Sequence, residues 1–395
     1  MEPGERTEPP EPTPPDALAA LQRAALALCA WFERLAAGER WLLKTALAAT
    51  LLALLCSFPR PAATTQIGSA PEWEPLREQI AQPLSPREHD PAGHAAKTAF
   101  RLVAPGLAHL LGLGPAGLKL FEALCGVLLF ALVALAAERT SGERRAAVLV
   151  TLLVASCFMG ISAFVEHRGF FDAVALLGLA LACAWRNPAA VLVGVSLACW
   201  TDERGALAAG LVALLHFVEA PAERGVKRVA DPCCLAVALA LGLYAGGRAW
   251  LGARYGLHTP LAGTGARYLV NQLNNLPLGL WTGLEGGWLL VLAAGLALWR
   301  AGRRALLLGA ILAGGLVIGA AFSVWDITRS LIYLLPCLFL GLRVLREHEP
   351  APARLTLCRV AFVLSLLWPN LYAAGKGEVS WNYPLPLMAL KYFES

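Results

Sequence analysis

The sequence predicts an all-α protein that crosses a membrane about eleven times, with about nine to twelve spans as the range. Of its 395 residues, 57% are hydrophobic and 15% are charged, whereas globular domains are about 45–50% apolar and about 25% charged. Leucine and alanine recur in runs that approach the ~20 residues needed to cross a hydrocarbon layer. The net charge of +5 is small and spread along the chain. These features exclude a soluble enzyme and a nucleic-acid binder.

The first forty residues predict two segments that do not cross the membrane. Residues 1–15 are rich in proline and glutamate without apolar periodicity, which predicts a disordered cytoplasmic tail. In residues 16–40, leucines and alanines alternate with charged residues, which predicts an amphipathic helix on the membrane surface. The first span then runs from Trp41 to about Phe58. It opens a membrane domain over residues 41–372, and residues 373–395 form an outer tail.

A long outer loop, residues 59–105, follows the first span. A loop of this length is usually functional. Its last part, from His94 to about Leu111, predicts a helix. Ten further apolar stretches follow, at about residues 118–137, 146–164, 170–185, 189–200, 206–218, 232–246, 280–299, 305–324, 330–345 and 355–368. Several are shorter than a lone spanning helix, so flanking residues must lengthen them or neighbouring helices must shield them.

The basic residues of the short connections predict the orientation. With a cytoplasmic amino terminus, the inner connections hold thirteen arginines and lysines, and the short outer connections hold Arg168, Arg204 and Arg329. The long outer segments, 59–105 and about 247–279, are left out because long loops follow the rule poorly. The prediction is an amino terminus inside and a carboxyl terminus outside.

The ten cysteines lie in or beside apolar stretches. No CxxC pair or Cys/His cluster is present, so the sequence indicates neither a disulfide framework nor a zinc site. We expect these cysteines to act as small apolar packing residues.

Three polar motifs precede spans that start at the outer face: residues 166–172 (EHRGFFD), 201–205 (TDERG) and 326–329 (DITR). A transporter is expected to hold its ionisable residues near the bilayer midplane. Polar motifs at one rim therefore predict a site at the outer membrane surface. Its candidate binding residues are Asp172, Asp202, Glu203, Asp326, Arg168, Arg204 and Arg329.

Each acid in these motifs also has a purely structural interpretation. An aspartate at a helix amino terminus stabilises it by about 0.3–1 kcal/mol, so Asp172, Asp202 and Asp326 suit helix caps. Capping does not explain the arginine near each acid. Arginines there either pair with the acids or bind a phosphate, whose geometry they match. Structural ion pairing and a phosphate site both stay open.

The densest polar cluster of the outer loop is residues 87–101 (REHDPAGHAAKTAFR). If residues 94–104 form a helix, His94, Lys97 and Arg101 share one face at i, i+3 and i+7. Glu88 and Asp90 lie on the chain that leads in. This cluster could bind an anion and hold a general base, although a hydrated loop without function carries similar charges.

From about residue 41 to 372, the chain resembles the integral-membrane glycosyltransferases of the GT-C fold. The shared features are a first span followed by a long acidic outer loop, many spans of uneven length, and polar motifs on the outer face. The family commonly shows two adjacent acids early in the first loop. The nearest matches are Glu72-Trp73-Glu74 and Glu88-His89-Asp90. Asp202-Glu203 is an adjacent pair at the same face, in a later connection.

The resemblance implies a multi-pass enzyme of the bacterial inner membrane that moves a sugar from a polyprenyl-phosphate donor to an envelope acceptor. Asp90 or Glu88 is expected to act as the general base. The departing lipid phosphate is expected to contact His94, Lys97, Arg101, Arg168, Arg204 and Arg329. A divalent cation could bridge carboxylates and phosphate, although no ligand spacing demands one. Membrane lipids are the other expected partners.

Two other functions stay open on the sequence alone. A transporter or flippase of a lipid-linked or anionic solute is favoured if Glu122 and the glycines of the 305–324 stretch line a pathway. A non-catalytic membrane subunit would use the outer loop to bind a partner.

Overall fold

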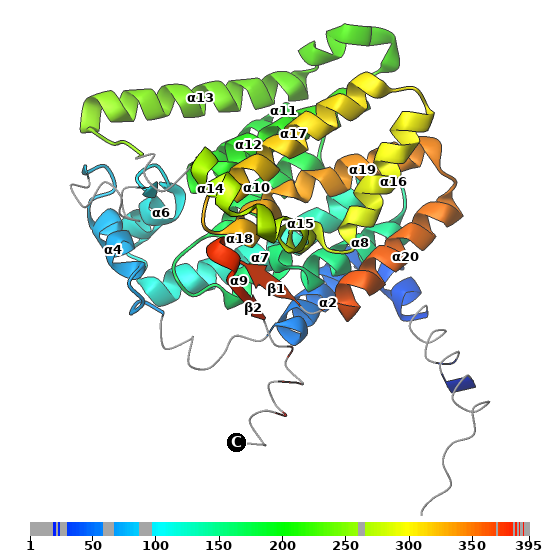
Figure 1. Ribbon diagram of the computed structural model, residues 1–395, viewed down its shortest axis with the longest axis horizontal. Helices are drawn as coiled ribbons and strands as arrows, with labels where there is room; N and C mark the ends of the chain where they lie inside the picture. The colour runs from blue at the N-terminus through cyan, green and yellow to red at the C-terminus, as the bar shows by residue number, and fades with distance from the viewer. Residues whose placement is uncertain are drawn as a thin grey trace, which may run out of the picture.

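The computed structural model is a bundle of α-helices with one small β-hairpin (Figure 1). It describes residues 19–20, 23, 30–57, 67–86, 97–259, 265–368, 370–381, 384, 387 and 390. The predicted tail, residues 1–15, lies outside these residues. Within the predicted surface helix, residues 30–36 are helical.

After the helical residues 30–36, the first part of the described chain continues with nine helices. They are α2 (Trp41–Cys56), α4 (Trp73–Ala81), α6 (Val103–Leu111), α7 (Pro115–Ser141), α8 (Arg144–Ser156), α9 (Phe158–Val165), α10 (Asp172–Ala184), α11 (Pro188–Thr201) and α12 (Arg204–Glu219).

The second part continues the bundle. Its α-helices are α13 (Pro232–Tyr255), α14 (Ala266–Asn271), α15 (Leu276–Leu284), α16 (Gly287–Arg300), α17 (Arg304–Phe322), α18 (Ile327–Leu331), α19 (Leu335–His348) and α20 (Ala351–Leu367). Short 3-10 helices lie at η1 (Ala222–Ala230), η2 (Leu273–Asn275), η3 (Ile332–Leu334) and η4 (Gly375–Gly377). The antiparallel strands β1 (Leu371–Ala373) and β2 (Val379–Trp381) pair Tyr372 with Ser380.

Four helical segments of the described chain are long and apolar enough to cross a membrane: Pro115–Ser141, Pro232–Tyr255, Arg304–Phe322 and Ile327–His348. Two bent pairs raise the number to six if each is one span: α8 with α9, bent by 53°, and α15 with α16, bent by 94°. The helices α2, α10 and α11 are apolar but shorter. The all-α prediction is confirmed, whereas eleven spans and their orientation stay predictions.

Leucines at every fourth position line the outside of several helices. Each of these side chains is more than half exposed: Leu43, Leu47 and Leu51 on α2; Leu120, Leu124 and Leu128 on α7; Leu235, Leu239 and Leu243 on α13. Contiguous apolar surface of this kind is rare on proteins surrounded by water and is normal against lipid. The long apolar helices and these leucine stripes indicate a membrane protein.

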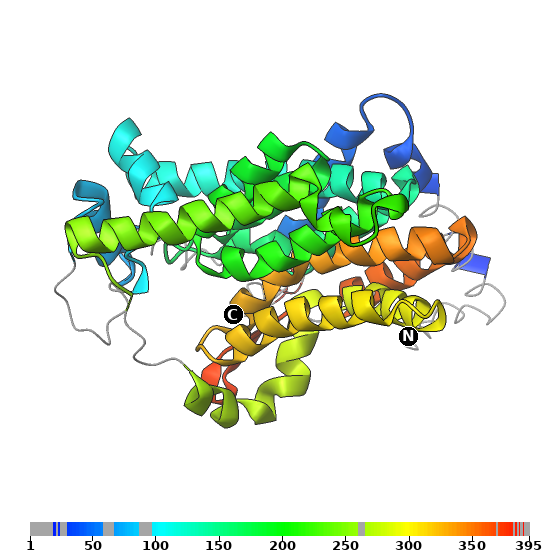
Figure 2. The ribbon, with the colours of Figure 1, turned by 90° about the horizontal axis from the view of Figure 1, so that it is seen from above.

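The two ends of the bundle are formed by different segments of the chain (Figure 1). At one end, Arg139 pairs with Glu219 at 2.5 Å and Arg303 with Glu347 at 3.1 Å. At the other end lie α4 and α6, the link between α9 and α10, and the start of α18. The hairpin packs at this second end, where the Ala373 N–H donates to the Thr328 hydroxyl. Seen from above, the bundle is several helices deep, and α14 lies beside the end of α17 (Figure 2).

Two predicted helix boundaries are wrong. A helix over residues 94–111 would place Pro105 in its interior, where the ring would clash with the carbonyl of Arg101. The observed α6 begins at Val103, so Pro105 falls in the first turn, where proline is tolerated. The apolar stretch at 232–246 continues as a helix to Tyr255, and on this extension Arg248 packs its guanidinium over the Phe100 ring, 4.2 Å from the ring centroid.

Candidate functional site

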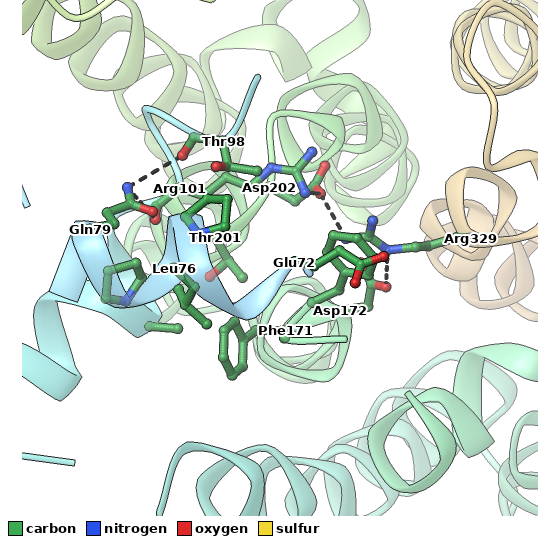
Figure 3. Close-up of a pocket in the computed structure, with 15 residues that line it drawn as sticks. Glu72, Leu76, Gln79, Thr98, Arg101, Phe171, Asp172, Thr201, Asp202 and Arg329 are labelled. Atoms are coloured by element: carbon green, nitrogen blue, oxygen red, sulfur yellow. Dashed lines mark hydrogen bonds and ion pairs between the residues drawn. The ribbon is translucent and has the colours of Figure 1, made fainter. Parts of the chain in front are cut away.

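A polar pocket lies at the end of the bundle that carries α4 and α6 (Figure 3). Helix α4 forms one wall, and the amino end of α10 and the carboxyl end of α11 form others. The polar lining residues are Glu72, Gln79, Thr98, Arg101, Asp172, Thr201, Asp202 and Arg329. The cavity measures about 40 Å³, which holds a few water molecules at ~10–15 Å³ each.

Arg329, on α18, forms the centre of a buried charge network. Its Nε donates to Asp172 Oδ2 at 2.5 Å, and its guanidinium lies 3.6 Å from Asp202 and 3.7 Å from Asp326. The guanidinium also covers the Phe170 ring, 3.6 Å from its centroid. Both Arg329 and Asp172 are almost completely buried. The network thus joins α18 to the starts of α10 and α12.

Asp202 receives more cations than any other acid of this network. Arg101 Nη1 lies 2.9 Å from Oδ2, Arg204 Nε donates to Oδ1 at 2.9 Å, and the Arg204 backbone N–H donates to the same oxygen. Burial alone would raise the pKa of Asp202, but Arg101, Arg204 and Arg329 outweigh it and lower the pKa to about 2. Asp202 is therefore ionised at neutral pH.

Two arginines extend the network outward. Arg101 donates to both oxygens of Glu203, at 2.8 and 3.1 Å. Arg204 donates to the Ser330 hydroxyl at 2.9 Å. Arg101 precedes α6 in a non-helical link, so it does not share a helix face with Lys97 as predicted. Lys97 itself lies outside the pocket lining.

Arg168 pairs locally with Glu166 rather than with Asp172. Its Nε and Nη2 donate to the two Glu166 oxygens at 2.9 and 2.6 Å. Burial would raise the pKa of Glu166, but the hydrogen bonds and charge of Arg168 lower it below its usual range. Phe170 separates this pair from Arg329 by contacting both guanidiniums.

Helix capping does not account for two of the three predicted cap acids. Asp172 is the first residue of α10, and its oxygens accept from Arg329 and from the Tyr333 hydroxyl at 3.3 Å. Asp326 precedes α18 without a capping hydrogen bond and accepts from the Tyr372 hydroxyl at 2.9 Å. Only Asp202 receives a backbone N–H in the manner of a cap.

Burying the charges of this network costs free energy, which favours a functional over a purely structural role for them. Removing ions from water is expensive, and apolar residues of similar volume often stabilise a core at least as well. Acids and arginines gathered in a small pocket are typical of functional sites. In the structure, every arginine of the network already pairs with an acid, so a phosphate would have to compete with these carboxylates.

Glu72 is the exception among the charged residues of the pocket. It makes no hydrogen bond or ion pair with the residues that the structure describes. The neighbouring Trp73 is buried and donates its indole N–H to the His167 carbonyl at 2.7 Å, which anchors α4 against the link before α10. The Glu72-Trp73-Glu74 motif was a signal for this residue, but spacing alone did not show that Glu72 faces the pocket.

A second polar cluster lies behind the pocket. The Lys119 ammonium donates to Glu122 at 2.8 Å and to the carbonyls of Ala163 and Glu166. Glu122 is therefore buried and paired, and does not reach the surface. Both ring nitrogens of the buried His167 lack a hydrogen-bond partner in the part of the chain that the structure describes. Burial, followed by the charge of Lys119, lowers the pKa of His167 to about 4, so its ring is neutral.

The other predicted site residues stay untested. Glu88, Asp90 and His94 lie outside the described residues. Within the described ranges, no group of three or more histidines, cysteines or acids is placed to hold a metal ion. Sequence reasoning did not select Glu72, Gln79, Thr98, Thr201 or Tyr333.

The fold and the site together define a helical membrane protein with a buried charge network at one end. No family model, curated protein or solved structure matches the chain.

Proposed function

We propose that the protein is a glycosyltransferase of the bacterial inner membrane that takes a sugar from a polyprenyl-phosphate donor. One observation carries the proposal: acids and arginines from separate links converge at one end of an apolar bundle. They lie beside a pocket lined by Glu72, a carboxylate without a partner among the described residues. This supports a site for an anionic substrate with a group able to accept a proton.

We further propose eleven passes with the amino terminus inside. The bundle end with Arg139 and Arg303 would then face the cytoplasm, in keeping with the positive-inside rule. The pocket would face outward, where a polyprenyl-linked sugar meets an envelope acceptor. The bent pairs α8 with α9 and α15 with α16 would each cross once.

In the proposed reaction, an acceptor hydroxyl attacks the anomeric carbon of the sugar. The bond from that carbon to the phosphate oxygen breaks, and Glu72 takes the hydroxyl proton. Arg329 and Arg101 would share their N–H groups with the departing lipid phosphate. Glu88 and Asp90, on the same outer loop, remain rival bases.

The cavity is too small for a sugar, so substrate entry requires α4 to move away from the start of α10. Trp73 and Gln79 hold α4 in place: Gln79 is buried and donates to the carbonyls of residues 98, 99 and 101 at 3.4 Å. The Gln79 contacts are long and weak, whereas the Trp73 hydrogen bond to the His167 carbonyl, at 2.7 Å, has to break for α4 to move.

The test is sugar transfer by the purified protein in liposomes that contain polyprenyl-phosphate sugars. Glu72→Gln should lower the rate roughly 100-fold or more. Glu74→Gln is the matched control, because Glu74 lies two residues further on, in the first turn of α4, with an exposed side chain. Glu88→Gln and Asp90→Asn are measured in parallel. If all three pocket and loop variants transfer normally, none of these acids is the base; if the wild type uses no such donor, the proposed activity is wrong.

The broken helices favour a transporter as the second candidate, because transporters use discontinuous helices at their binding sites. Movement of a fluorescent polyprenyl-linked sugar across sealed vesicles, without transfer to an acceptor, would support this candidate over the enzyme.

A further inference from the structure

Two broken helices meet inside the bundle, away from the pocket. The pair α8 and α9 bends at Cys157, and the pair α15 and α16 bends at Glu285 and Gly286. The Ser365 hydroxyl of α20 joins the two breaks: it accepts the Gly286 N–H at 2.9 Å and contacts the Cys157 thiol at 3.7 Å. The same thiol lies 3.9 Å from the Leu284 carbonyl.

The junction lies deep in the apolar part of the molecule. Helix α8 has 13 residues and α16 has 14, and both connect the junction to the basic end of the bundle. At 1.5 Å per residue, the junction is about 20 Å from that end. A hydrocarbon layer is about 30 Å thick. Glu285 therefore lies within the apolar layer rather than at its rim.

The backbone at Glu285 is strained. With φ of 47° and ψ of −123°, Glu285 is the only non-glycine residue with positive φ in the part of the chain described. Such a conformation is unfavourable for a residue with a side chain and tends to occur at functional sites. The following residue fixes this geometry, because a Cβ at Gly286 would lie 2.0 Å from the Ala361 carbonyl oxygen.

The Glu285 carboxyl has no cationic partner among the described residues. The side chain is 1% exposed, and Oε2 lacks a hydrogen bond. The titratable groups that face it are two thiols, Cys157 at the α8–α9 break and Cys56 at the end of α2; α20 contributes Ser365. One turn earlier, the indole N–H of Trp281 also lacks a partner among the residues that the structure describes, and its ring contacts the half-exposed Trp368.

We infer that Glu285 is a proton-binding site: it holds an exchangeable proton at the crossing of the two broken helices. An ionised carboxylate there would lose its hydration without gaining a cation, so the neutral acid is the stable form. Ionisable residues inside membrane bundles typically serve proton or ion movement, and broken helices commonly form such sites. The indole N–H of Trp281, without a partner among the described residues, is a polar group between Glu285 and the half-exposed Trp368. This site is independent of the proposed sugar transfer.

Infrared spectroscopy of the full protein in phosphatidylcholine vesicles tests the inference. The wild-type spectrum should contain a neutral-carboxyl C=O band that is absent in Glu285→Gln, and the band should shift when D₂O replaces H₂O. Glu74→Gln is the control and should leave the band unchanged, because Glu74 is exposed to solvent. A band that does not shift in D₂O would mean that the Glu285 proton does not exchange with solvent. The absence of any such band would mean that Glu285 is ionised. Either result overturns the inference.

Carbodiimide labelling tests the same site without any variant, should Glu285→Gln fail to fold. The acid O–H adds across one C=N bond of dicyclohexylcarbodiimide: the carboxyl oxygen bonds to carbon and the proton moves to nitrogen. We expect mass spectrometry to find the adduct on Glu285 at neutral pH and less of it at higher pH. If added Na⁺ protects Glu285 from labelling, the site binds a cation in place of a proton, and the inference is wrong.

Discussion

Arg329 and Asp172 form a buried ion pair, with 2.5 Å between Nε and Oδ2, although 157 residues separate them in the sequence. The pair fastens α18 to α10 and places both residues beside the pocket (Figure 3). Both side chains are almost completely buried, and Asp172 is the acid that lies closest to Arg329, ahead of Asp202 and Asp326. The pair is therefore a direct test of the network.

A double-mutant cycle on this pair should show strong coupling. Arg329→Met leaves Asp172 buried without its closest cation and should destabilise the protein by about 3–5 kcal/mol. The double variant Arg329→Met with Asp172→Leu should recover much of this loss, since apolar pairs often replace buried ion pairs without cost. Chemical unfolding in detergent micelles measures all four proteins. Additive effects of the two substitutions would contradict the coupling.

Acidification should first reduce stability through His167. Its pKa in the folded protein is lowered to about 4 from an ordinary value of 6.5, so the unfolded chain binds the proton more readily. The contribution of His167 is therefore complete above about pH 6.5 and is lost as the pH falls toward 4. His167→Gln should flatten the dependence of melting temperature on pH in this range. An unchanged slope would mean that His167 does not titrate as a buried neutral ring.

A second loss should occur at lower pH through Asp202. Its pKa is lowered to about 2 from 3.8 by the surrounding arginines, so its stabilisation is present above about pH 4 and is lost as the pH falls toward 2. Asp202→Asn should remove this acid-dependent part and leave the loss between pH 6.5 and 4 in place. Identical acid profiles of wild type and Asp202→Asn would contradict this assignment.

Thiol labelling tests the proposed orientation. In a cysteine-free background, Glu74→Cys should react with a membrane-impermeant reagent in intact cells, whereas Ala301→Cys should react only after the membrane is opened. Both positions are exposed in the structure and lie at opposite ends of the bundle. Ser141 is fully buried and so is unsuitable as the inner site. The reverse labelling pattern would place the pocket in the cytoplasm.

The sequence by itself determined where most helices lie. The apolar run at 118–137 became α7, and the run at 189–200 became α11, with errors of a few residues. Apolar runs are enough to locate these helices, because the hydrogen bonds of a helix join residues that are close in sequence, and its apolar face is visible in the spacing of its residues. The sequence also predicted that the polar motifs lie at helix ends, and Asp202 and Asp326 lie there in the structure.

Only the tertiary structure decided which charges meet. Local spacing pointed to Arg168 as the partner of Asp172, but Arg168 pairs with Glu166 and Asp172 pairs with Arg329. The break at Cys157 was hidden because an apolar run continues across it. Glu285-Gly286-Gly287 interrupts the second run, but neither the bend there nor the facing of Glu72 into the pocket follows from spacing. Such contacts depend on how distant helices pack against one another, and no short-range pattern in the chain records that packing.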